Sequence, residues 1–161
     1  MLFVCTGNLC RSPMAAALLE KLARRDGLRG VEVDSAGTHA LPGAPPPPEA
    51  VEVAGQVGVD LKAHRAGPLT EELVEWADRI LVMEPAHADY VETHHPGAAR
   101  KVEFLATYKP IPEPQGSVGD PIGQPLYCYR LCFGELMEAV QGLVRELKKS
   151  RGPRGAPARR G

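Results

Sequence analysis

The first dozen residues constrain the fold more than any other part of the chain. An apolar run at residues 2–5 leads into a tight polar stretch at residues 6–12. Apolar residues at helical spacing follow, at Met14, Leu18 and Leu22. This pattern predicts a strand, a short loop and a helix in immediate succession at the start of an α/β domain.

The polar stretch, called the phosphate loop below (residues 6–12), has the features of an anion site. Five residues separate Cys5 from Arg11, too few for a further element, so the loop N–H groups can converge above the helix N-terminus. The planar fork of Arg11 can hold two oxygens of a phosphoryl group. We therefore expect phosphate to be bound by Arg11 with the other loop residues, Thr6, Gly7, Asn8, Leu9, Cys10 and Ser12.

Cys5, at the floor of this loop, is the candidate nucleophile. Helix N-termini and nearby cations lower the pKa of thiols to roughly 3.5–7.5, so the groups that bind phosphate also favour a thiolate. Ser12 can donate its hydroxyl proton to that sulfur. Gly7 and Asn8 are expected to take the positive φ values that such a turn requires.

Asn8 is the single asparagine of the chain. Avoidance of this thermolabile residue elsewhere suggests a thermostable protein in which Asn8 is kept for its geometry. Cys10 lies five residues after Cys5, and we expect that it either traps an oxidised Cys5 as a disulfide or simply packs in the loop.

The run over residues 4–13 closely resembles the active-site loop of the low-molecular-weight protein tyrosine phosphatases. Segments 34–38, 77–83 and 120–121 follow in the order of that family, so the resemblance covers roughly residues 2–149. It implies a four-stranded, flavodoxin-like sheet, a hydrogen bond between Ser35 and Asn8, and a structural His64 beside the loop.

The rest of the chain predicts a single doubly wound parallel sheet with helices on both faces. Strands are expected at residues 2–5, 31–34, 78–83 and 101–105, and helices at residues 49–56, after Thr70, after Pro85 and at residues 125–149. The buried stripe expected on the last helix comprises Leu131, Leu136, Val140, Leu143 and Leu147.

Asp120 lies before Pro121 in a long proline-rich loop, where proline keeps the preceding backbone extended and aims the carboxyl group. We expect Asp120 to protonate the leaving group and then to activate water. The predicted catalytic residues are thus Cys5, Arg11 and Asp120, with Ser35 as loop support.

No metal or other cofactor is expected. His87, His94 and His95 lack an ordered ligand set and are expected on a solvated helix face. A zinc site of Cys5, Cys10, Cys128 and Cys132 has only loosely suitable spacing, so the two helix cysteines are expected to be buried as small apolar groups.

Length and composition indicate a single domain, and the resemblance implies that it is a phosphatase domain at residues 1–149. The basic tail at residues 150–161 is expected to be disordered. The tail holds four arginines and no acid, while the whole chain has a net charge of −1, so nucleic acid is not expected as a partner. With no signal segment and no apolar run near eighteen residues, we expect a cytoplasmic monomer without membrane contact.

The predicted activity is hydrolysis of phosphotyrosine in proteins through a cysteinyl-phosphate. Some bacterial relatives of the family act on phosphoarginine, and resemblance suggests that these carry Thr where this chain has Leu9. Arsenate reductase is a weaker alternative, because no cysteine lies between Cys10 and Cys128. A phosphoprotein-binding module is weaker still, because it has no use for Cys5 or Asp120.

Overall fold

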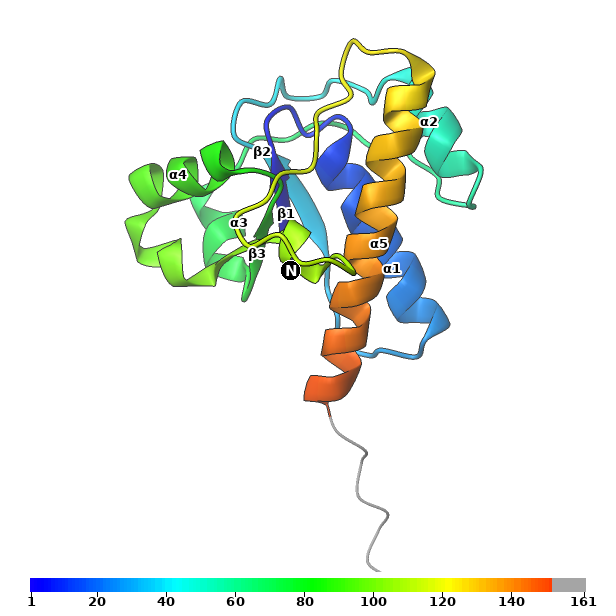
Figure 1. Cartoon of the computed structure of the whole chain (residues 1–161). Helices are drawn as coiled ribbons and strands as arrows, with labels where there is room; N and C mark the ends of the chain where they lie inside the picture. Colours follow the sequence, from blue (N-terminus) through cyan, green and yellow to red (C-terminus); the bar gives the residue numbers. More distant parts are fainter. Residues whose placement is uncertain (152–161) are drawn as a thin grey trace, which may run out of the picture.

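The computed structural model describes residues 1–151. Within them, four parallel strands form one sheet, which helices surround (Figure 1). The strand order is β2-β1-β3-β4, with bounds Leu2–Cys5 for β1, Asp34–Gly37 for β2, Ile80–Val82 for β3 and Val102–Phe104 for β4. Because β2 and β3 lie on opposite sides of β1, the topological switch point lies between β1 and β3. The predicted fold class is confirmed.

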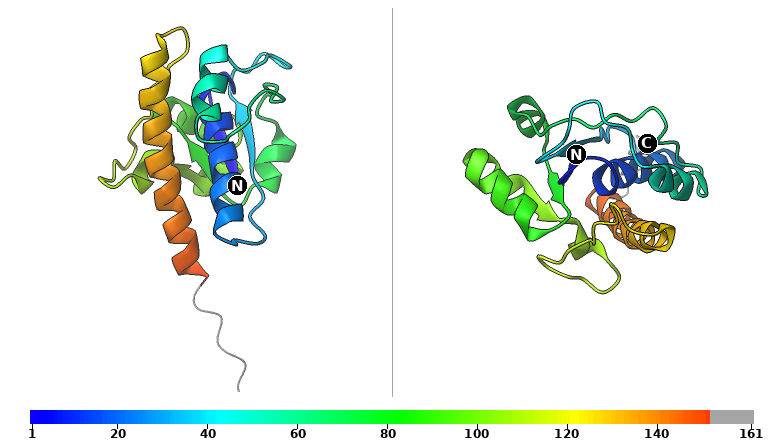
Figure 2. Two further views of the ribbon diagram at one scale, coloured as in Figure 1. Left: turned by 90° about the vertical axis from the view of Figure 1, so that its right-hand side faces the viewer. Right: turned by 90° about the horizontal axis from the view of Figure 1, so that it is seen from above.

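Helices cover both faces of the sheet, as the view from above shows (Figure 2). One side holds α1 (Arg11–Arg25), α2 (Pro48–Gly55) and α5 (Leu126–Ser150), and the other holds α3 (Glu71–Trp76) and α4 (Pro85–His94). Two short 3₁₀ helices, η1 (Pro96–Lys101) and η2 (Leu105–Tyr108), flank β4.

The alternation of side chains along the central strands divides the core into two layers. Phe3 and Leu81 pack with α1 and α5, whereas Leu2, Val4 and Ile80 pack with residues of α3 and α4. All five side chains are fully buried. Burial of each such side chain contributes about 1.5–3 kcal/mol, so the central strands hold the site rigidly.

The sequence predicted the helix starts well. Met14, Leu18 and Leu22 form a buried stripe on α1. The Thr70 side chain caps α3 by accepting a hydrogen bond from the Leu73 N–H. α4 begins at Pro85, where the missing N–H of proline is not needed.

The predicted position of the second strand was wrong by about three residues. β2 begins at Asp34 rather than at residue 31, because β1 begins at Leu2 and pairs it with Asp34. Val31 and Val33 lie before this pairing and pack partly buried against the core instead. The alternation of apolar and polar residues over 31–34 therefore indicated correctly that the valines are buried in part, but it did not indicate a strand at these positions.

One residue of the predicted stripe on α5 was also wrong. Leu131 is 64% exposed. The buried face passes through Tyr129, Cys132, Phe133 and Leu136, which are spaced by three and four residues and so share one side of the helix. Leu131 falls outside that spacing.

The predicted boundary at residue 149 falls inside α5, which ends at Ser150. The rest of the predicted tail, residues 152–161, lies outside the described residues. Within residues 1–151, no helix has the length and apolar character needed to cross a bilayer.

Candidate active site

The phosphate loop connects the carboxyl end of β1 to the start of α1. Cys5 is the last residue of β1, Cys10 is the N-cap position, and α1 begins at Arg11. Within residues 1–151, no backbone N–H from Gly7 to Arg11 donates a hydrogen bond to another protein group. These donors, beside the positive end of the helix dipole, are therefore free to bind an anion.

Asn8 fixes the shape of the loop. It is 1% exposed and has φ of 54°, a left-handed conformation that asparagine tolerates. Its Nδ2 donates to Ser12 Oγ and to Ser35 Oγ, each at 2.9 Å, and its Oδ1 accepts from the Gly67 N–H at 2.9 Å. The predicted contact with Ser35 is present. Gly7, also expected at positive φ, does not adopt it.

Two further residues hold the loop from outside. His64 Nε2 donates to the Asn8 carbonyl oxygen at 2.8 Å, a structural contact as predicted. Gly37, at the end of β2, lies so close to the loop that a Cβ would be 2.6 Å from the Thr6 carbonyl oxygen. Only glycine fits there, a requirement that the sequence analysis missed.

Cys5 is buried, and its Sγ lies 3.0 Å from Ser12 Oγ. Ser12 Oγ accepts from Asn8 and lies farther, 3.3 Å, from the Ala36 carbonyl oxygen. Because Asn8 fills an acceptor position of this hydroxyl, its proton is available to the sulfur.

Arg11 is 2% exposed and spans the site. Its Nη1 donates to Glu84 Oε2 at 2.8 Å and to the Val118 carbonyl oxygen at 3.0 Å, while Nη2 donates to Asp120 Oδ2 at 3.0 Å. Burial acts to lower the pKa of Arg11, but the carboxylates of Asp120 and Glu84 raise it above the ordinary value. The cation is thus permanent and oriented.

Asp120 completes a pocket of about 130 Å³ lined by Cys5, Thr6, Gly7, Leu9, Cys10, Arg11, Asp120 and Ile122. Its other carboxylate oxygen accepts from the Ile122 N–H at 3.1 Å, which fixes the side chain. The structure therefore places the three predicted catalytic residues around one small cavity. Leu9 and Ile122 give that cavity apolar walls.

The four cysteines are free thiols. Burial, reinforced by Asp120 and Cys5, raises the pKa of Cys10 well above its ordinary range. Cys132 is buried as predicted, whereas Cys128 is only partly buried. Among residues 1–151, no cluster of three or more His, Cys, Asp or Glu side chains could hold a metal ion.

The prediction for His87 was wrong. It is 1% exposed rather than solvated, because α4 turns this side chain inward onto Thr6. Glu84, His87 and Val118 are site residues that the sequence analysis missed. For Glu84 a signal was available, since it follows β3, and the carboxyl ends of parallel strands converge at such sites.

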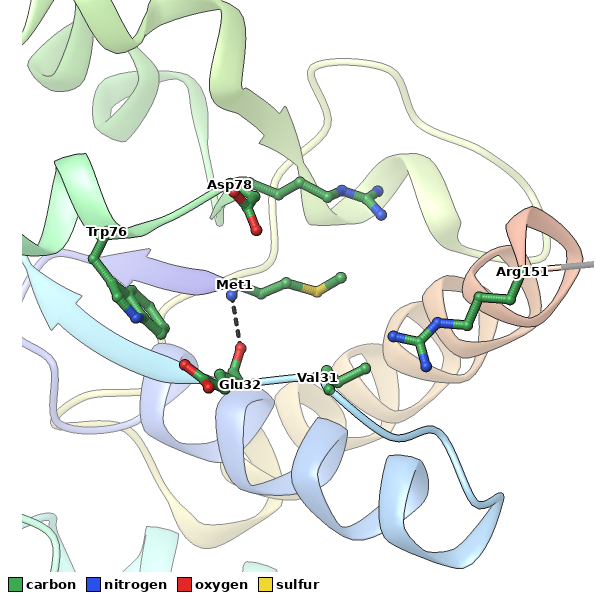
Figure 3. A pocket seen from close by; sticks show the side chains of 8 residues that line it. Met1, Val31, Glu32, Trp76, Asp78 and Arg151 are labelled. Carbon is green, nitrogen blue, oxygen red and sulfur yellow. Dashed lines mark hydrogen bonds between the residues drawn. The ribbon is translucent and has the colours of Figure 1, made fainter.

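A larger cavity of about 390 Å³ lies at the opposite end of the sheet (Figure 3). Met1, Glu32, Trp76, Asp78, Arg79 and Arg151 are among its lining residues. None of its lining residues within 1–151 has a thiol or a hydroxyl group, so these residues offer no nucleophile comparable to Cys5.

Comparison with known proteins identifies the family. Residues 1–152 match the family described as "Low molecular weight phosphotyrosine protein phosphatase". A protein-arginine-phosphatase of Bacillus subtilis is 40% identical, over 94% of this chain and 98% of the relative. A probable low molecular weight protein-tyrosine-phosphatase, EpsP, of Ralstonia nicotianae is 42% identical over 88% of each chain.

A solved structure shows the same fold. The YwlE arginine phosphatase, in a cysteine-to-serine mutant with a phosphorylated active-site serine, superposes with a TM-score of 0.86 at 40% identity. The alignment covers 93% of this chain and 96% of the other. With the site geometry, these likenesses confirm the predicted resemblance, and the chain belongs to the low molecular weight phosphotyrosine protein phosphatase family.

Proposed function

We propose that this chain hydrolyses phosphotyrosine in proteins through a cysteinyl-phosphate intermediate. The observation that supports this most directly is the pocket shared by Cys5, Arg11 and Asp120, with the Ser12 hydroxyl 3.0 Å from the sulfur. The nucleophile Cys5, the anion-binding Arg11 and the proton donor Asp120 are thereby within reach of one bound phosphoryl group.

The first step forms an S–P bond as the Cys5 thiolate attacks phosphorus, and the P–O bond to the phenol breaks. Arg11 and the loop N–H groups hold the remaining oxygens, where charge spreads in the transition state. A phosphoryl group competes with Asp120 for Arg11 Nη2, so the carboxylate is released from the cation and takes up a proton from solvent. Protonated Asp120 then gives this proton to the departing oxygen.

The second step returns the enzyme to its starting state. Asp120 accepts a proton from water as the water oxygen attacks phosphorus, and the S–P bond breaks. The released thiolate accepts a hydrogen bond from the Ser12 hydroxyl, which keeps its proton. The products are the free phenol and inorganic phosphate, and no metal ion or other cofactor takes part.

The apolar walls favour a phenyl leaving group. Leu9 and Ile122 offer no partner for a guanidinium, and leaving such donors unpaired costs roughly 1–3 kcal/mol. Phosphoarginine is the second candidate substrate, because two of the similar relatives are named protein-arginine-phosphatase.

Matched phosphotyrosine and phosphoarginine peptides test this choice. We expect kcat/KM for phosphotyrosine to exceed that for phosphoarginine by about tenfold or more in the wild type. Leu9→Thr, which adds a hydroxyl to the wall, should shift the ratio towards phosphoarginine. Faster phosphoarginine turnover by the wild type would reverse the assignment, and an unchanged ratio in the variant would exclude Leu9 as its cause.

The same proposal extends to the setting in which the enzyme acts. We place it in the cytoplasm, where its four free thiols stay reduced, as a heat-stable monomer that does not bind nucleic acid. Sedimentation of the purified chain tests whether it is a monomer, and thermal unfolding tests its heat stability.

A further inference from the structure

His87 is a buried polar side chain that the mechanism above leaves unused. It comes from the first turn of α4, on the side of the sheet opposite α1. Its Nε2 lies 2.9 Å from Thr6 Oγ1 and 3.8 Å from Glu84 Oε1. Its Nδ1 is buried and has no hydrogen-bond partner among the described residues. A polar ring so placed requires a reason.

The contacts of the ring indicate which nitrogen holds the proton. A proton on Nδ1 would be a buried donor without an acceptor, which is rare in folded proteins. A proton on Nε2 is donated to Thr6 Oγ1 and is also attracted by the Glu84 carboxylate. Neutral His87 is thus a donor to Thr6.

This assignment has a consequence for the hydroxyl of Thr6. Its oxygen accepts from His87 and, more weakly, from Arg11 Nη2 at 3.5 Å. A hydroxyl has two acceptor positions and one donor proton, so the proton of Thr6 remains to be donated. Thr6 lines the pocket with Cys5 and Arg11, where that proton can meet a bound anion.

We propose that His87 is a positioning residue of the active site: it holds the Thr6 hydroxyl as an additional hydrogen-bond donor to the phosphoryl group in the pocket. The loop N–H groups and Arg11 are then supplemented by a side-chain donor that a residue outside the loop orients. This inference rests on the proposed function only in its choice of phosphoryl ligand.

Binding of inorganic phosphate, measured by calorimetry, tests the proposal without turnover. Thr6→Val removes the hydroxyl at constant shape and should weaken phosphate binding about tenfold, as expected for a hydrogen bond to a charged group. His87→Phe removes the donor and keeps a ring, so it should cause a similar loss. His87→Gln places an amide N–H near the position of Nε2 and should restore most of the affinity.

A double variant separates positioning from packing. If His87 acts through Thr6, His87→Phe should weaken phosphate binding in the wild type and have no further effect in Thr6→Val. Equal losses in both backgrounds would overturn the proposal, as would unchanged binding by Thr6→Val or a His87→Gln variant as weak as His87→Phe. Thermal unfolding identifies any variant that does not fold, and in that case Thr6→Val alone decides.

Turnover of p-nitrophenyl phosphate distinguishes failure of the proposed phosphatase function from failure of the positioning role of His87. A wild type that binds phosphate but does not hydrolyse this ester would contradict the proposed function and leave the binding test intact. A wild type that hydrolyses it, with kcat/KM insensitive to Thr6→Val, would contradict the positioning proposal alone.

Discussion

A cavity lies at each end of the sheet, and the smaller of the two is the one lined by Cys5, Arg11 and Asp120. The cavity at the amino ends of the strands has about 390 Å³, against about 130 Å³ at the carboxyl ends. At the amino end, the Arg79 cation is paired with carboxylates and the Met1 ammonium with a carbonyl oxygen. Arg79 donates two hydrogen bonds of 2.7 Å to Glu103 and one of 3.1 Å to Glu146. The Met1 ammonium donates to the Glu32 carbonyl oxygen (Figure 3).

At the carboxyl end the donors exceed the protein's own acceptors. The N–H groups from Gly7 to Arg11 have no protein partner among residues 1–151, and the Arg11 cation is buried beside them. Strand direction explains the difference, because β1 delivers its last residue to a helix N-terminus only at this end. Cavity size therefore does not locate the chemistry, but unpaired donors do.

The largest expected effect comes from removing the sulfur. Cys5→Ser should lower kcat for p-nitrophenyl phosphate by roughly a thousandfold or more, because the serine hydroxyl is a far weaker nucleophile at neutral pH. Phosphate or vanadate binding should remain detectable by calorimetry, because Arg11 and the loop N–H groups are intact. As a matched control at the amino end, Asp78→Asn should leave kcat/KM unchanged.

Arg11→Lys tests whether charge alone suffices. A lysine keeps the cation but lacks the planar fork in which one nitrogen holds Glu84 while the other reaches Asp120 or a competing phosphoryl oxygen. We expect kcat/KM to fall by roughly a hundredfold, as for loss of one preorganised donor. Activity close to that of the wild type would mean that a point charge in the pocket is enough. Arg79→Lys is the matched control at the other end of the sheet.

Asp120→Ala should have an effect that depends on the leaving group. Phenyl phosphate needs its departing oxygen protonated, and its kcat/KM should fall by roughly a hundredfold, within the usual contribution of a general acid. p-Nitrophenyl phosphate has a better leaving group, and its kcat/KM should fall only about tenfold. Equal losses in kcat/KM, which reports the step in which the leaving group departs, would show that Asp120 is not the acid.

The sequence predicted the parts of the site that lie on one continuous segment. Cys5, Arg11 and Ser12 belong to a single strand-loop-helix unit, whose geometry follows from local rules. The contact of Ser35 with Asn8 and a structural role for His64 beside the loop were predicted through the family resemblance, because the spacing of these residues in sequence does not indicate contact. The Asn8 carbonyl oxygen as the partner of His64 was not predicted.

What the sequence did not predict depends on how distant segments pack. His87 looks like a surface residue of a polar helix, and only the rotation of α4 about its axis turns it towards Thr6. Gly37 is required because β2 ends against the loop, and Val118 contributes only its backbone oxygen. Such contacts leave no local pattern, and the same reason explains the shifted start of β2.

The smallest predicted effect concerns the free energy of unfolding, which should decrease at acid pH because of His87 at the carboxyl end of the sheet. Burial lowers the pKa of His87 to about 4, and the nearby Arg11 cation acts in the same direction. In the unfolded chain its pKa returns to about 6.5. Between these values the unfolded state binds more protons, so the free energy of unfolding should fall by about 3 kcal/mol as pH decreases from 7 to 4.

His87→Gln isolates this contribution. The groups that face His87, namely Arg11, Glu84, Asp120 and His39, stay in both proteins, so their titration largely cancels in the difference. Urea unfolding at pH 7 and pH 4 should show that the wild type loses about 3 kcal/mol more than this variant. His94→Gln, an exposed change on the same helix, should keep the wild-type slope. If the free energy of unfolding changed equally between pH 7 and pH 4 in the wild type and in His87→Gln, the acid sensitivity of the fold would not come from His87.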